Sequence, residues 1–117
     1  MSVDSKISTA LESVLPGAVF PNLYTGALLN YAVWAYTEIP TVFADRAPHA
    51  ARYLVQVHYF LPHKENPNPV KRQLQRALFD AGCTWPSILN ASDSEGQHYV
   101  LECEYADGGG YYGQAST

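Results

Sequence analysis

The sequence predicts an α+β domain in which two helices pack on one face of a mostly antiparallel, four- to five-stranded sheet. The chain has 117 residues, which is the usual size of one domain. Apolar side chains recur at helical spacing in residues 4–15 and 68–81, and they alternate with a period of two in residues 30–38, 53–61 and 98–105. A helix with one apolar stripe must bury it, and a sheet is the economical partner.

The first helix is expected over residues 4–15. Asp4 or Ser5 can cap its start, and Pro16-Gly17 ends it because proline lacks the N–H donor and glycine accepts the turn. Its apolar face is formed by Ile7, Leu11, Val14 and Leu15.

Strands are predicted to follow the first helix. Residues 18–24 indicate an edge strand or an extended arm, since Pro21 interrupts them. Residues 30–38 indicate a strand that Pro40 stops, followed by a short continuation over 41–45 and a turn at 46–48. Alternation places Trp34, Tyr36 and Glu38 on one face of this strand. Residues 53–61 are apolar or aromatic on both faces, which predicts a central strand covered on two sides, with a neighbouring subunit as a natural second cover.

The second half of the chain predicts a helix and two strands. Asn68 caps a helix with Pro69 in its first position, and Gly82 closes it. A weaker strand over 83–89, a polar turn over 90–96 and a last strand over 98–105 follow. Residues 1–106 thus form a single domain, and residues 107–117 are expected to be a flexible tail rich in glycine and tyrosine.

The composition is typical of a subunit in an assembly. Charged residues make up 15% of the chain, against about 25% in an average domain, while aromatic residues reach 13% and include nine tyrosines. Aromatic rings must therefore cover part of the surface, as they do at protein interfaces. The net charge is −4, and only Lys71, Arg72 and Arg76 cluster, so avid binding of a DNA backbone is not expected.

The sequence shows no leader peptide and no apolar run approaching the roughly 20 residues that span a membrane. We therefore expect no membrane partner and synthesis in the cytosol, where Cys83 and Cys103 stay reduced. Both cysteines lie on predicted strands, so a bridge between them is geometrically conceivable.

No motif indicates an enzyme, a metal or a cofactor. Cys83, His98 and Glu102 can be combined into a nucleophilic triad on paper, but no strained elbow or glycine-built oxyanion loop accompanies them. The glycines after Asp107 lack the Lys-Ser or Lys-Thr of a phosphate loop. Possible metal ligands are scattered without the close pairs of a zinc site: His49, His58, His63, Cys83, His98 and Cys103.

The order of these elements resembles the small tail-terminator and tail-completion proteins of long-tailed bacteriophages, together with their head–tail joining neighbours. The resemblance spans residues 4–105 and rests on residue class and order. It is carried by "VDSKISTALESVL", "AVFPNLY", "YAVWAYTEIP", "ADRAP", "YLVQVHYFLP", "PVKRQLQRALFDAG" and "HYVLECEYA".

The resemblance implies a structural virion protein of the tail or neck, assembled in the host cytoplasm. Such terminators form a ring, usually a hexamer, that caps the tail tube, stops its growth and meets the head connector. The implied partners are other copies of the chain, the tail tube protein and the connector proteins, with DNA passing through the lumen without specific binding. A ring closes by heterologous contact, so Arg46 and Arg52 are expected to pair with acidic residues of a neighbour. The candidate interface residues are Trp34, Tyr36, Glu38, Arg46, Arg52, Glu102 and Glu104.

Two alternatives remain open from the sequence. A head-completion or stopper protein of the connector is also a small ring-forming subunit, and it would bind the portal complex in place of the tail tube. A small enzyme or ligand-binding α+β domain would instead use His58 or His98 in a concave site and persist as a monomer or dimer.

Overall fold

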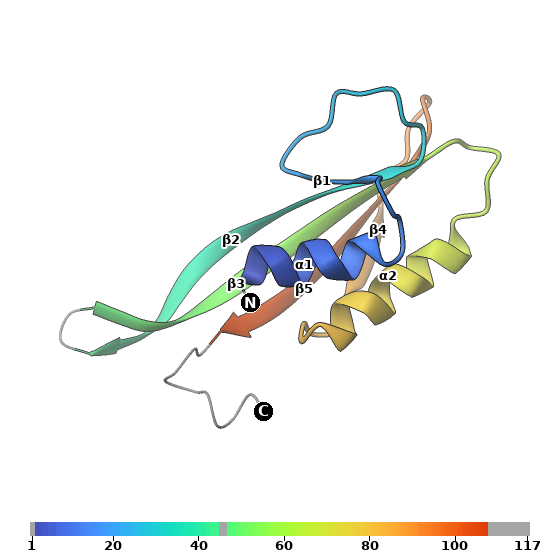
Figure 1. The fold of residues 1–117 in the computed structure, drawn as a ribbon. Helices are drawn as coiled ribbons and strands as arrows, with labels where there is room; N and C mark the ends of the chain where they lie inside the picture. The colour runs from blue at the N-terminus through green and yellow to red at the C-terminus, as the bar shows by residue number, and fades with distance from the viewer. Residues whose placement is uncertain (1, 45–46, 108–117) are drawn as a thin grey trace.

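The computed structural model describes residues 2–44 and 47–107. They form an open five-stranded sheet with the order β1-β2-β3-β5-β4, antiparallel except for the parallel pair β1–β2. Both helices lie on the same side of the sheet (Figure 1). The predicted α+β class is confirmed. In chain order the elements are α1 (Val3–Glu12), β1 (Val19–Pro21), β2 (Tyr31–Ala44), β3 (Ala47–Leu61), α2 (Asn68–Asp80), β4 (Ser87–Asn90) and β5 (Gln97–Asp107).

Both predicted helices are present, with shifted ends. Ser2, and not Asp4 or Ser5, caps α1: its hydroxyl oxygen accepts a hydrogen bond from the Ser5 backbone N–H. The helix ends at Glu12, so Val14 and Leu15 pack on the core from the turn that follows. In α2, Asn68 is already helical, and Gly82 terminates the helix with φ +110°, in the left-handed region that favours glycine.

The core lies between the helices and one face of the sheet. Every second residue of β3, from Tyr53 to Leu61, is buried there, and β3 is the middle strand, as its two apolar faces predict. The helices contribute apolar side chains at helical spacing, such as Ile7 and Leu11 from α1. The most deeply buried members of this core are Ile7, Leu11, Leu74, Leu78, Leu101, Val55 and Val57.

The β2–β3 hairpin is much longer than predicted. Pro40 does not end the strand, because β1 pairs only with Ala32–Trp34 and leaves the rest of β2 as an edge strand. An edge strand with a bulge tolerates proline, and the register shifts directly after Pro40. The pairing of β3 with β5 stops at Ala51, so the hairpin continues beyond the sheet as a two-stranded arm (Figure 1). The molecule measures 53 × 25 × 23 Å.

The last two strands also differ from the prediction. The weaker strand begins at Ser87 and not at Cys83, because Trp85-Pro86 interrupts the pairing with β5 after a single bond from the Thr84 N–H to the Glu104 carbonyl. β5 runs on to Asp107, two residues past the predicted end at 105. Most of the predicted tail, residues 108–117, lies outside the described residues and stays a prediction.

Candidate functional site

The face of the sheet opposite the helices carries no layer among the described residues, and we call it the open face. It is the candidate functional site because an uncovered sheet face with large apolar side chains is unusual for a monomer. Aromatic rings lie at the end of this face where β5 begins, and polar or charged groups lie at the end nearer the hairpin arm. Its side chains come from alternate residues of the strands and include Phe20, Tyr31, Val33, Ala35, Thr37, Leu54, Gln56, His58, Phe60, His98, Glu102 and Glu104.

Five rings form a continuous aromatic row across one end of the open face. The register sets Tyr31 beside Phe60 and Phe60 beside His98, and Tyr24 folds back from the loop after β1 to join them. The ring centroids are 4.8 Å apart for Tyr31–Phe60 and 4.2 Å apart for Phe60–His98. Phe20 and Tyr24 stack at 4.1 Å, and Tyr24 lies 4.8 Å from Tyr31. Such pairs are favourable beyond their buried area, so the row is a stiff apolar surface.

A histidine pair extends this row. His58 Nδ1 and His98 Nε2 are 2.8 Å apart, so one ring donates a hydrogen bond that the other accepts. Burial lowers the pKa of His98, and the charge of His58 lowers it further, while Asp93 acts in the opposite direction. The neutral form of His98 is favoured, which suits a surface that a partner would cover.

A hollow lies beside the row of rings. Its volume is about 540 Å³, and its lining includes Tyr31, Phe60 and His98. Leu28 and Leu29 also line it and are 43% and 73% exposed. Asp93 and Glu95 belong to the same lining. The rings and leucines give this hollow an apolar interior beside two acidic groups.

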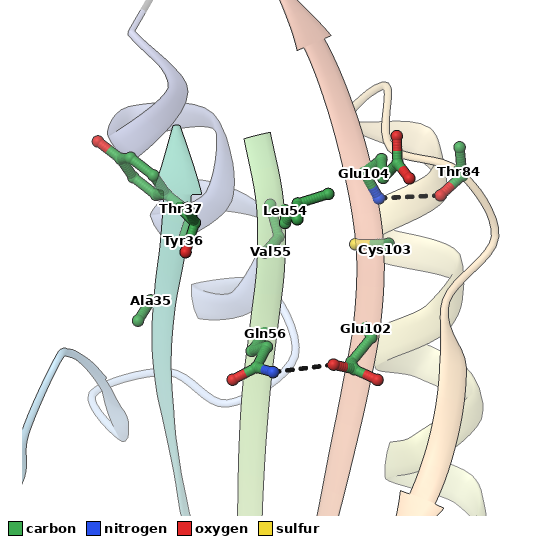
Figure 2. Close-up of a pocket in the computed structure, with 10 residues that line it drawn as sticks. All are labelled: Ala35, Tyr36, Thr37, Leu54, Val55, Gln56, Thr84, Glu102, Cys103 and Glu104. Carbon is green, nitrogen blue, oxygen red and sulfur yellow. Dashed lines mark hydrogen bonds between the residues drawn. The ribbon is translucent and has the colours of Figure 1, made fainter. Parts of the chain in front are cut away.

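The polar end of the open face holds a second hollow of about 430 Å³ (Figure 2). Gln56 Nε2 donates to Glu102 Oε2 across β3 and β5 at 2.8 Å, and the Glu104 N–H donates to Thr84 Oγ1 at 2.9 Å. Arg52 Nε lies 3.5 Å from Glu104 Oε1. Both members of that ion pair are about half exposed, so the pair contributes little to stability. The carboxylates are therefore oriented, yet accessible to a partner.

The structure separates the sequence-predicted interface residues into two groups. Arg52, Glu102 and Glu104 come together on the open face, where Arg52 contacts Glu104 of its own chain. Glu38 lies on β2 and is exposed, while Arg46 lies outside the described residues. The pairing of the arginines with a neighbouring subunit stays a prediction.

The prediction that Trp34 and Tyr36 lie at an interface needs a correction, because both residues belong to the covered face. Trp34 is 5% exposed and packs in the core, and Tyr36 packs against that core while its hydroxyl donates to Asp4 of α1 at 2.5 Å. The rings available to a partner are those of the opposite set. Sequence alternation already placed Tyr31 outside the set of Trp34, but only the cross-strand register shows that Phe60 lies beside Tyr31. Nothing in the sequence marks Tyr24, which joins the row from a loop.

Tyr36 gives the stability a pH dependence. The hydrogen bond to Asp4, then burial and the charge of Asp4, raise the pKa of Tyr36 from 10.0 to about 12. Because the pKa is raised in the folded state, the stabilisation from this tyrosine is fully present below pH 10 and is lost as the pH rises toward 12.

Tyr36→Phe should lower the free energy of unfolding by about 0.5–1 kcal/mol at neutral pH, measured by urea titration. It should also remove one component that titrates near pH 12 from the tyrosinate absorbance curve. Identical curves for the two proteins would contradict this assignment.

No catalytic arrangement is present among the described residues. Cys83 and Cys103 are buried free thiols that interact on the covered side of β5, and this contact raises the pKa of Cys103. His98 and Glu102 point to the opposite face of the same strand, so the triad conceivable from the sequence is not assembled. Within residues 2–44 and 47–107, no group of three or more His, Cys, Asp or Glu side chains could hold a metal ion. No helix in the described ranges is long and apolar enough to cross a membrane.

No protein-family model matches the chain, and no curated protein matches it.

Proposed function

We propose that this protein is a structural subunit of a bacteriophage virion, a tail terminator that closes into a ring on the tail tube and joins the tail to the head connector. The observation that carries the proposal is the open face. It pairs a half-buried aromatic row with oriented carboxylates, and the described part of the chain offers nothing catalytic to explain it. A subunit interface explains the rings, because aromatic residues are enriched in such contacts. The oriented carboxylates offer partners for an arginine of a neighbouring subunit.

The hairpin arm supports the same proposal. A two-stranded ribbon is marginally stable alone in water, and the outer part of β2 and β3 pairs with no third strand among the described residues. Contact with another subunit would stabilise it. A ring needs two different matching surfaces on each copy, and an arm at one end with an open face beside it can provide them.

The experiment that tests the proposal is assembly, followed with and without tail tubes. Sedimentation over a concentration range and negative-stain electron microscopy should show rings of about six copies with a central hole, or rings seated on tube ends. Binding to tube ends separates a terminator from a head-completion protein, which would bind portal complexes. A protein that binds neither structure and forms no ring would refute the proposal.

A further inference from the structure

A second exposed apolar surface lies on the helix side of the molecule, at the end of α2. Phe79 and Trp85 are 46% and 49% exposed, and their ring centroids are 5.6 Å apart in an edge-to-face arrangement. The Arg76 guanidinium carbon lies 5.2 Å from the centroid of Trp85 and 5.8 Å from that of Phe79. We call Arg76, Phe79 and Trp85 the cationic corner.

The hollow beside the aromatic row has the complementary character, and we call it the acidic hollow. Of the residues described as lining it, Asp93 and Glu95 carry charge, and both are negative. The lining also includes aromatic rings and leucines, such as Tyr31, Phe60 and Leu29. An exposed pair of rings with one arginine thus matches a hollow lined by rings, leucines and two carboxylates, in both polarity and sign of charge.

One copy of the chain cannot bring these two surfaces together. The acidic hollow opens beside the open face, at the end where β5 begins, while the cationic corner follows α2 on the helix side (Figure 1). Two different surfaces that match each other on separate copies generate a heterologous contact, which leads to rings or filaments.

From this complementarity we propose that the cationic corner of one copy docks into the acidic hollow of the next. This inference rests on the proposed ring function and names its contact surfaces. Arg76 is available for such a contact: its pairing with Asp80 at 3.7 Å is an exposed helix pair, with 63% exposure on each side chain, and such pairs are weak. In the docked state a guanidinium can hold a carboxylate of the hollow with two parallel hydrogen bonds while Trp85 fills the apolar interior.

The test is a charge-exchange experiment on the full chain. Glu95 is the acidic residue to change, because Asp93 Oδ1 accepts the Glu95 N–H and holds the turn through its side chain, whereas Glu95 enters that bond through its backbone. Arg76→Glu and Glu95→Arg are each expected to weaken self-association at least about tenfold in sedimentation, since each places like charges together. The double variant should restore association to within about threefold of wild type.

Two further variants sharpen the result. Trp85→Ala should weaken association about 30-fold, as expected for a central tryptophan anchor. Lys64→Glu makes the same charge reversal in the loop before α2, outside both surfaces, and should leave association within about threefold of wild type. Circular dichroism should show all variants folded, because the changed side chains are exposed.

The outcomes distinguish this inference from the proposed function. Rings from wild type that are unaffected by Arg76→Glu, or a double variant that stays as weak as the singles, overturn the docking and leave the ring function standing. The hollow would then be free for another partner, such as the tail tube protein. Open oligomers that never close or cap tubes refute the ring function. They support the docking if each single charge variant weakens their association and the double variant restores it. A wild-type monomer at every concentration overturns the docking.

Discussion

Replacing Phe60 with Glu is expected to abolish ring formation while the subunit stays folded. Phe60 lies inside the aromatic row, with Tyr31 at 4.8 Å on one side and His98 at 4.2 Å on the other. A charge at this point would be buried without a partner once a neighbouring subunit covers the open face, which costs several kcal/mol. The apparent dissociation constant for self-association should therefore rise more than about 100-fold, measured by sedimentation.

A matched variant controls for the added charge itself. Thr9→Glu introduces the same carboxylate on the exposed surface of α1, on the other side of the molecule, and should leave assembly unchanged. Phe60→Leu keeps the apolar character and loses only the ring stacking, so it should weaken assembly by about tenfold or less. Normal rings from folded Phe60→Glu protein would show that the aromatic row is not part of the subunit contact.

Leu101→Ala is expected to lower the free energy of unfolding by about 2–5 kcal/mol, which is a large part of the stability of a domain this size. Leu101 is fully buried in the middle of β5, directly between Val57 of β3 and Ile88 of β4. Its removal leaves a cavity that a sheet clamped by two helices cannot close. Urea unfolding followed by circular dichroism measures the loss, at concentrations where the wild type is monomeric.

The same substitution at Leu89 gives the control. Leu89 lies on the neighbouring strand β4 and is 61% exposed, so Leu89→Ala should change the unfolding free energy by about 0.5 kcal/mol or less. Similar losses at both positions would mean that the covered face of the sheet is not the core.

Local spacing was enough to predict much of the fold. Helical spacing in the segments around Ile7 and Leu74, and strict alternation from Tyr53 to Leu61, reflect periods of 3.6 and 2 that depend on the residue's own neighbours in the chain. The two apolar faces of β3 likewise predicted its central place in the sheet. Boundaries were less well determined: Pro40 was expected to end a strand, but its effect depends on which strand lies alongside β2.

The residues of the candidate site were harder to predict from the sequence, because their arrangement depends on tertiary structure. Alternation separated Trp34 and Tyr36 from Tyr31, but it could not tell which of the two faces the helices would cover or that Phe60 lies beside Tyr31. Both sets are aromatic, and the choice is made by packing across many residues. The pairing of Arg52 with Glu104 of its own chain also arises from the register of β3 and β5, which no local pattern contains.

Side-chain periodicity and composition were sufficient to predict the α+β class, the two helices, the central position of β3 and an aromatic content too large for the core alone. Four features became visible only in the folded chain: the strand order, the length of the hairpin arm, the stacking of Tyr24 with Tyr31, and the placement of the cationic corner away from the acidic hollow. Each of them involves residues distant in the chain, and such contacts form only when the whole sheet is assembled.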